Sequence, residues 1–366
     1  MNYMTFLRCE QRIEFQGFFT YRMLIDGNKV GFRPAATHIN KQKAKESVLN
    51  EALEIKYSRG DCITNFQIHF GDATPFLNRN LWSPLYWESP SANDLEWYYS
   101  KCPAGYIKGE NLRNRQEIYV PMQISYYPPK RIKRENKLNW ATTNGLSFDK
   151  NSLELAYLKG TMEICERDSI MCWWYKEIEA VELTDLKMNM SLKEIIQTIE
   201  FNNYDIHVYR INNDLPCHNV MVLIYSEQYF PKYALGSASS NNIYKAIEHA
   251  IYESVNTAVG LRWYNFYEPG SYIVNNSNKV FDKFKRIEKK QSVKRFEEET
   301  FKTLDDFMNQ TNYNFYGVIL SDKEGYTTRV LSPELQNLIV NSYSPISERL
   351  LKCNRNRLET TKHPFL

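Results

Sequence analysis

The sequence lacks a strong excess of either charge. Its 46 lysines and arginines nearly balance its 43 aspartates and glutamates, and the formal net charge at pH 7 is +3. Proteins dedicated to nucleic acids usually carry a clear basic excess or a basic face. The balance therefore argues against nucleic acid as a partner.

Long apolar runs and a targeting segment are also missing. No stretch approaches the roughly 18 consecutive apolar residues that suggest a membrane-spanning helix. The N-terminal sequence MNYMTFLRCEQRIEF has no basic start followed by an apolar run, so we expect no signal peptide. The seven cysteines are scattered and form no CxxC pair, which is typical of reduced thiols. We therefore expect a cytoplasmic protein without a membrane partner.

Three familiar site patterns do not occur. The sequence contains neither GxxxxGK[ST] nor GxGxxG, so a nucleotide would have to be held without a glycine-rich loop. No His/Cys cluster has the spacing of a zinc site. The adjacent Cys217 and His218 make a poor nucleophile and base, because neighbouring side chains of a strand point to opposite faces.

The composition that is present indicates a globular protein of mixed α/β class. Hydrophobic residues make up 43% and aromatic residues 14% of the chain, which predicts a large core. Helical periodicity and β-branched or aromatic runs alternate along the chain. We expect helices over 41–57, 151–170 and 242–258, and strands over 116–127, 204–210, 220–225 and 315–320.

We expect one domain over 1–366, with three segments outside its regular core. The stretch 281–307 has mixed charges and predicts an exposed helix or a mobile charged segment. The Pro-Pro break and basic run at 128–136 predict a solvated loop. The tail 360–366 forms the third segment.

The helix expected at 151–170 is apolar around most of its circumference, and one stripe of residues breaks this pattern. Carboxylates on such a helix are costly unless they meet a cation or a metal. The small residues that precede the acids suggest room for a ligand. The stripe consists of Ser152, Ala156, Gly160, Glu163, Glu166 and Arg167.

Two further helices carry acids and small residues on one face. Ser47, Glu51 and Glu54 share a face of the helix at 41–57. Asn242, Ala246, His249, Ala250 and Glu253 share a face of the helix at 242–258. Five converging carboxylates would repel one another unless divalent cations lie among them. Mg²⁺ prefers oxygen ligands and shares them with phosphates, and Arg167 suits a phosphate oxygen. The pattern predicts a Mg²⁺–nucleotide site built from helix faces.

At these residues the chain resembles the YcaO family, and the likeness extends over most of its length. Its motif SxxxExxE is matched by Ser47, Glu51 and Glu54. Its Asn-Gly turn and helix ending in ExxER are matched by Asn144, Gly145, Asn151, Glu163, Glu166 and Arg167. The third motif, Ax₃Ax₂E, ends at Glu253, and the segments 327–340 and 347–351 look like later parts of the family pattern.

The resemblance implies a YcaO-type fold and an ATP-dependent cyclodehydratase. Such enzymes phosphorylate a backbone amide oxygen of a ribosomally made precursor peptide and form thiazoline or oxazoline from Cys, Ser or Thr. The implied cofactors are ATP and Mg²⁺. The implied metal ligands are Glu51, Glu54, Glu163, Glu166 and Glu253, and the implied nucleotide contacts are Ser47, Asn151, Arg167 and His249. Arg167 and the terminal carboxylate of Leu366 are the implied catalytic groups.

The sequence departs from the family pattern at several positions. The tail ends His363-Pro364-Phe365-Leu366 without the outer prolines of PxPxP, Leu155 replaces a common acid, and Ile55 follows Glu54 where the family often has Arg. Two alternatives stay open: a thioamide- or amidine-forming YcaO enzyme, and a non-catalytic YcaO scaffold subunit. The implied partners are the precursor peptide, a leader-binding protein related to ubiquitin-activating enzymes, an FMN-dependent dehydrogenase, and a second copy of the chain within a complex.

Overall fold

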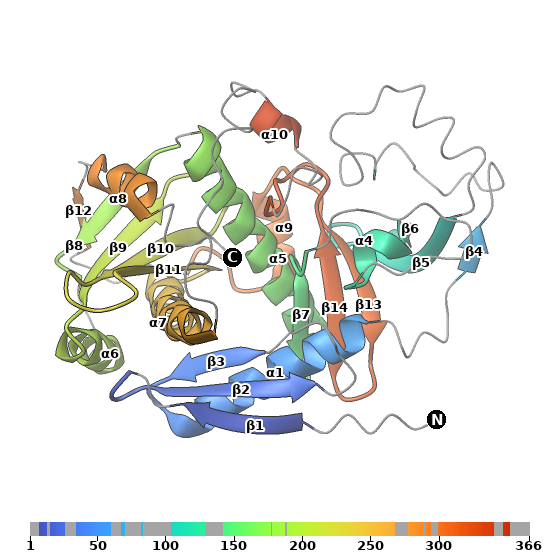
Figure 1. The fold of residues 1–366 in the computed structure, drawn as a ribbon. Helices are drawn as coiled ribbons and strands as arrows, with labels where there is room; N and C mark the ends of the chain where they lie inside the picture. Colours follow the sequence, from blue (N-terminus) through green and yellow to red (C-terminus); the bar gives the residue numbers. More distant parts are fainter. Residues whose placement is uncertain are drawn as a thin grey trace. The chain divides into compact units, whose positions relative to one another are not determined.

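The computed structural model (Figure 1) has two compact units. The described residues are 7–12, 15–25, 34–59, 67–69, 82, 104–128, 142–176, 178–186, 189–267, 277–287, 290–293, 299–339 and 347–351. The first unit takes its described residues from Met1–Ala52 and Ile178–Thr300, and the second from Leu53–Glu177 and Phe301–His363. The mixed α/β class that the sequence predicts is confirmed.

The first unit contains two sheets. Strands β1 (Leu7–Arg12), β2 (Phe19–Ile25) and β3 (Ala35–His38) form an antiparallel sheet in that order. The other sheet has the order β11-β10-β9-β8-β12, and only β12 runs parallel to its neighbour, β8. Its strands are β8 (Ala180–Thr184), β9 (Asp205–Ile211), β10 (His218–Tyr225), β11 (Tyr233–Ser240) and β12 (Lys290–Ser292).

Helices cover the larger sheet of this unit. Helix α7 (Ile243–Tyr267) packs against β10 and β11 (Figure 1). Helix α6 (Met190–Phe201) begins at the N-cap Asn189, whose side chain accepts a hydrogen bond from the Leu192 amide, and it buries Leu192, Ile195, Ile196 and Ile199 on one stripe. Helix α8 (Ser277–Lys285) follows α7 in the chain. Apolar side chains from α6, α7 and the strands form the core.

The second unit is built on a six-stranded sheet of order β4-β5-β13-β14-β7, with β6 also paired to β5. The strands are β4 (Gln67–His69), β5 (Ala104–Asn111), β6 (Glu117–Pro121), β7 (Leu146–Asp149), β13 (Tyr316–Ser321) and β14 (Tyr326–Leu331). Helix α5 (Leu153–Met171) packs against β7 and β14 and continues as a π-helix, η2 (Cys172–Lys176). Shorter helices are α4 (Met122–Ser125), α9 (Leu304–Gln310) and α10 (Glu348–Leu351).

The three long helices of the sequence analysis are confirmed. Helix α1 (Lys41–Ser58) begins in the first unit and ends in the second. Helix α5 starts after the N-cap Ser152, whose side chain accepts from the Leu155 amide. Helix α7 is longer than predicted and runs on to Tyr267. The strands predicted near 204–210, 220–225 and 315–320 correspond to β9, β10 and β13.

Two local predictions were wrong. The stretch 116–127 is not one strand, because β6 ends at Pro121, which caps the short helix α4. The stretch 281–307 is not one exposed helix. It contains the end of α8, then β12, which pairs with β8, and then α9, which starts at a capping box of Thr303 and Asp306. Of the predicted loop 128–136 only Pro128 lies within the described residues.

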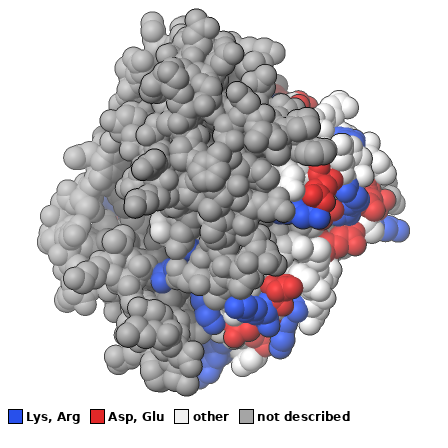
Figure 2. All heavy atoms as spheres, turned by 90° about the vertical axis from the view of Figure 1, so that its right-hand side faces the viewer, with Lys and Arg blue, Asp and Glu red and all other residues white. Residues whose placement is uncertain are grey.

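Charges of both signs are interspersed on the surface. Figure 2 shows basic and acidic side chains next to one another over the described part of one face. Exposed ion pairs of the second unit, such as Arg115–Asp305 at 3.0 Å and Lys56–Glu324 at 3.4 Å, are of this kind. Within the described residues, no helix combines the length and apolar character that crossing a membrane requires.

Candidate functional site

The small residues of α5 serve close packing on the sheet. Ala156 is fully buried, and a Cβ on Gly160 would lie 2.7 Å from the Gly145 carbonyl oxygen and 2.9 Å from Val330 Cγ2. The Ser147 hydroxyl also donates a hydrogen bond to the Ala156 carbonyl over 2.6 Å. The interpretation that these small residues leave room for a ligand was therefore wrong, because β7 and β14 fill that space.

The Asn-Gly turn before α5 places a backbone donor at the first acid of the helix. Gly145 has φ of +74°, and a Cβ there would collide with the Val330 carbonyl oxygen, so this position requires glycine. The Gly145 amide donates a hydrogen bond of 3.0 Å to Glu163 Oε2. The turn and the helix are thus joined through the carboxylate of Glu163.

Glu163, Glu166 and Arg167 form one charged group on α5. Arg167 Nη2 lies 3.7 Å from Glu163 Oε1, and Arg167 Nη1 lies 3.2 Å from Glu166 Oε1. Their side chains are only 14–23% exposed. Two carboxylates therefore share one guanidinium in a largely desolvated place.

Arg329, which the sequence motifs did not indicate, contributes a second cation. Arg329 lies on β14, is 3% exposed, and donates a 3.1 Å hydrogen bond to the Thr142 carbonyl. Burial lowers the pKa of Arg329 to about 10, while Glu163 and Glu54 act in the opposite direction. A charged residue inside the buried run of β14 was the available signal, since burying an uncompensated charge is costly.

The carboxyl group of Glu163 is held close to protonation. Its pKa is raised from 4.5 to about 7, mainly by burial and also by the charge of Glu166. Arg167, Arg329 and the Gly145 amide oppose this rise without cancelling it. A further cation beside this carboxyl group would stabilise its charged form.

The acids of the second unit fit a magnesium ion by their chemistry. Glu163, Glu166 and Glu54 offer carboxylate oxygens, which are the ligands that Mg²⁺ prefers. At Glu163, burial raises the pKa by more than Arg167 and Arg329 lower it. In the described part of the chain, however, no group of three or more His, Cys, Asp or Glu side chains is arranged to hold a metal. The set fits a metal that shares its ligands with phosphate oxygens and water.

In the first unit, Glu51 of α1 contacts β3, whereas Ser47 lies on an exposed part of the helix. Glu51 Oε2 accepts a hydrogen bond of 3.1 Å from the Ala35 amide, and Ser47 is exposed. Asn256 of α7 donates to the Ala35 carbonyl over 2.9 Å and accepts from the Thr37 hydroxyl over 3.4 Å. The structure thus brings α1, β3 and α7 together within this unit.

The predicted residues of α7 have different surroundings. His249 and Glu253 are exposed, whereas Ala246 and Ala250 are fully buried in the core. Asn242 caps the helix, because its Oδ1 accepts from the Tyr244 amide over 2.9 Å. Here too the small residues fill the interface with the sheet, and the acid and the imidazole face away from it.

His38 is a neutral imidazole in the same unit. Its Nδ1 accepts a hydrogen bond of 2.8 Å from the Asn40 amide, and its ring stacks on Tyr252 with centroids 4.2 Å apart. The pKa of His38 is lowered to about 4, mainly by burial and also by the charges of Lys43 and His249. The bond to Nδ1 leaves the proton on Nε2, the only donor that this ring can offer.

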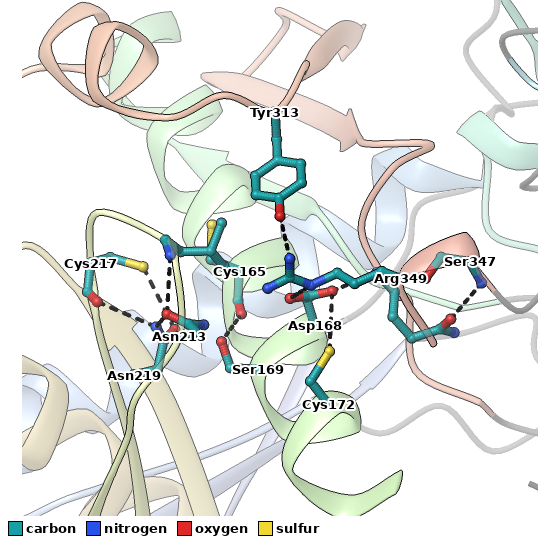
Figure 3. A network of polar contacts seen from close by, with 12 residues as sticks. Cys165, Asp168, Ser169, Cys172, Asn213, Cys217, Asn219, Tyr313, Ser347 and Arg349 are labelled. Carbon is teal, nitrogen blue, oxygen red and sulfur yellow. Dashed lines mark hydrogen bonds and ion pairs between the residues drawn. The ribbon is translucent and has the colours of Figure 1, made fainter. Parts of the chain in front are cut away.

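Three remaining predictions have separate outcomes. Asn151 is exposed and precedes α5, and its amide donates to Asp149 Oδ1 over 2.9 Å. Leu366 and the tail lie outside the described residues. Cys217 Sγ lies 3.6 Å from Asn219 Oδ1 (Figure 3), and the adjacent His218 is buried, so the thiol has a neighbouring amide as its hydrogen-bond partner.

Comparison with known proteins identifies the family. The sequence model of the YcaO cyclodehydratases, described as binding ATP and Mg²⁺, matches residues 35–336. No match was found among curated protein sequences. The predicted cofactors, ATP and Mg²⁺, are thereby confirmed at the level of the family.

Solved structures share the fold. YcaO from Methanopyrus kandleri bound with AMPPCP and Mg²⁺ is 16% identical with a TM-score of 0.70, over 93% of this chain and 89% of that one. A chain of the E. coli microcin synthetase McbBCD complex is 14% identical with a TM-score of 0.68, over 96% and 97%. A heterocyclase in complex with substrate and cofactor is 16% identical with a TM-score of 0.69, over 87% of this chain and 48% of that one, so this chain spans about half its length. The match over 35–336 shows that the chain belongs to the YcaO family of ATP- and Mg²⁺-binding cyclodehydratases.

Proposed function

We propose that this chain uses ATP to activate a backbone amide of a ribosomally made precursor peptide and forms a thiazoline or oxazoline. The γ-phosphoryl group passes to the amide oxygen, the neighbouring Cys, Ser or Thr side chain adds to the carbonyl carbon, and phosphate leaves. The observation that carries the proposal is the group of Glu163, Glu166 and Arg167 at the Asn144–Gly145 turn, in the family that binds ATP and Mg²⁺.

The second unit supplies the best-defined part of this site. Glu163, Glu166 and Glu54 would hold Mg²⁺, which neutralises charge on the transferring phosphoryl group. Arg167 lies beside two acids, and its guanidinium would bind a phosphate oxygen. Arg329 stays buried behind Glu163 and keeps part of its charge compensated. Phosphoryl transfer asks mainly for such positioning and charge balance.

The other predicted site residues are assigned on the family motifs alone. Ser47 and His249 of the first unit and Asn151 of the second are the proposed nucleotide contacts, and Glu51 and Glu253 of the first unit are proposed metal ligands. The exposure of Ser47, His249 and Glu253 supports this, because these side chains are accessible to a ligand. The Leu366 carboxylate is proposed as the base that takes the proton of the attacking side chain.

Partners are part of the proposal. The McbBCD neighbour is a complex, and one of its structures has pro-MccB17 bound. We expect this chain to act likewise with a precursor peptide and a separate leader-binding protein. The same complex could also contain an FMN-dependent dehydrogenase or a second copy of the chain. A thioamide- or amidine-forming reaction would use the same ATP site with an external nucleophile, and a scaffold subunit would not use it.

Calorimetric titration with a non-hydrolysable ATP analogue, with and without Mg²⁺, tests the site. We expect Mg²⁺-dependent binding by the full chain, and a loss of at least about 100-fold, or about 2.7 kcal/mol, in Glu163→Gln and Glu166→Gln. Glu154→Gln is the matched control, because Glu154 is an exposed acid of the same helix and only accepts a 3.4 Å hydrogen bond from the Leu304 amide. Unchanged binding in both acid variants refutes the site.

The reaction is tested separately from the site. With the leader-binding protein and a Cys-containing precursor present, each azoline formed lowers the peptide mass by one water, about 18 Da by stoichiometry. A sulfur-for-oxygen exchange in the product would instead favour thioamide formation. Deletion of Phe365 and Leu366 should abolish turnover and spare nucleotide binding, and unchanged turnover would exclude the tail from catalysis.

A further inference from the structure

A fully buried ion pair lies directly after the acids of α5. Asp168 is 0% exposed, and its Oδ2 lies 2.9 Å from Arg349 Nε on α10 (Figure 3). The Arg349 side chain is itself only 14% exposed. A buried pair of this kind gives little net stability, because desolvation of both charges offsets their attraction. It therefore calls for another role.

The pair gathers separate segments of the second unit. The other oxygen of Asp168 accepts a 2.8 Å hydrogen bond from the Gln336 amide, and Gln336 Oε1 accepts a 2.7 Å bond from the Ser347 amide. Arg349 Nη1 also donates to the Tyr313 hydroxyl, and the guanidinium lies 5.1 Å from the centre of that ring. Helix α5, the segment after β14 and helix α10 thus meet at one carboxylate.

The acids of α5 are held between this pair and a second anchor. On the N-terminal side, Glu163 is bonded to the Gly145 amide and lies in the field of Arg329 on β14. On the C-terminal side, Asp168 is bonded to Gln336, which follows the same strand. Glu166 and Arg167 lie between the two anchors. The turn that carries them cannot rotate about the helix axis without breaking one of these anchors.

We propose that Asp168 and Arg349 are positioning residues that hold Glu163, Glu166 and Arg167 in the orientation required for Mg²⁺–nucleotide. This inference rests on the proposed function of that site. Asp168 and Arg349 act through the backbone of α5 and do not touch the nucleotide. Partners that orient ligand-bearing residues strongly affect metal affinity even when they contact no metal.

The experiment compares three variants of the full chain. Asp168→Asn keeps an acceptor for the Gln336 amide and removes the charge, and Arg349→Lys keeps the charge and removes the planar guanidinium. Arg113→Lys is the matched control. Arg113 also anchors this unit, by donating to the carbonyls of Met308, Thr311 and Tyr313, and it has no contact with Asp168 among the bonds described.

The readout is the Mg²⁺ concentration that gives half-maximal binding of a non-hydrolysable ATP analogue, measured well below the melting temperature of each variant. We expect Asp168→Asn and Arg349→Lys to raise it about tenfold or more. Arg113→Lys should lower the melting temperature and leave the Mg²⁺ requirement at the wild-type value. A purely structural role would affect all three variants alike.

Two results overturn the inference in different ways. If the pair variants bind with the wild-type Mg²⁺ requirement, or shift it no more than the control does, Asp168 and Arg349 have no positioning role and the proposed function stands. If the wild-type chain shows no Mg²⁺-dependent binding, the proposed function fails and the inference with it. Should Asp168→Asn not fold, Arg349→Lys decides by the same criterion.

Discussion

Helices α5 and α7 use small residues in the same way and acids in different ways. Both lie on a sheet, and both bring small residues into contact with it: Ala156 and Gly160 in α5, Ala246 and Ala250 in α7. Glu163 and Glu166 of α5 are largely desolvated and share Arg167, and Glu163 also interacts with Arg329, whereas Glu253 of α7 is exposed. A motif of acids and small residues thus combines two functions, helix–sheet packing and charge.

The two helices differ in the burial of their acids, and this burial sets the charge balance of the site. On α5 the pKa of Glu163 is raised to about 7, because burial outweighs the nearby cations there. On α7 the solvent screens an exposed acid, and substitution costs little stability. The predictions below separate these two situations, from the largest expected effect to the smallest.

Removing Arg329 should have the largest effect on stability. Arg329→Met keeps most of the volume but leaves the acids of the second unit without their buried cation, and we expect a loss of about 3–5 kcal/mol at pH 8. Chemical denaturation measures it. The loss should shrink at pH 5, where Glu163 is protonated. A pH-independent loss would contradict the electrostatic account.

Adding one methyl group distinguishes the two helix–sheet interfaces. In Gly236→Ala on β11 the Cβ would collide with the Ala250 carbonyl oxygen and the Ser254 amide nitrogen, both backbone atoms of α7, and we expect a loss of about 3 kcal/mol. Gly160→Ala on α5 should cost less, about 1–2 kcal/mol, because alanine's better helix propensity offsets part of the overlap. Thermal unfolding of both variants checks the order, which equal losses would contradict.

Glu163 and His38 should make the stability of the protein depend on pH in opposite directions. Because the native pKa of Glu163 is raised to about 7, the native state binds more protons than the unfolded state above pH 4.5, and stability falls as pH rises to 7. Because the pKa of His38 is lowered to about 4, its neutral form is the stable one, and stability falls as pH drops from 6.5 to 4. Each effect amounts to at most about 1.4 kcal/mol per pH unit.

Two single substitutions measure how much each group contributes to the pH dependence of stability. Between pH 5 and 6.5, Glu163→Gln should become more stable with rising pH relative to wild type, and His38→Gln should become less stable. Denaturant midpoints across this range provide the measurement. If Glu163→Gln runs parallel to wild type, the acid does not titrate there.

The smallest change in stability is expected on α7. Glu253→Gln should alter the free energy of unfolding by less than about 0.5 kcal/mol, because the side chain is exposed. As a proposed metal ligand it should still weaken Mg²⁺–nucleotide binding about tenfold. Calorimetry and thermal unfolding on the same sample separate the two effects, and unaltered binding would remove Glu253 from the site.

Local patterns sufficed for much of the fold. Helical periodicity predicted α1, α5 and α7, and β-branched runs predicted β9, β10 and β13, because each pattern depends on residues a few positions apart. The helix prediction for 281–307 was wrong because it, too, depended only on residues a few positions apart. Its charge pattern was that of a helix, but pairing of β12 with the distant strand β8 decided otherwise.

By itself the sequence determined the family, the cofactors and the helices that carry Glu163, Glu166 and Arg167, since these follow from motifs of fixed short spacing. Only the tertiary structure decided which groups those acids meet. Arg329 and Arg349 come from strand and helix segments far along the chain, and it is folding that buries them beside Glu163 and Asp168. Burial and counter-charge, which set the pKa of Glu163 and the cost of the Asp168–Arg349 pair, depend on distances in space, and a linear pattern does not contain them.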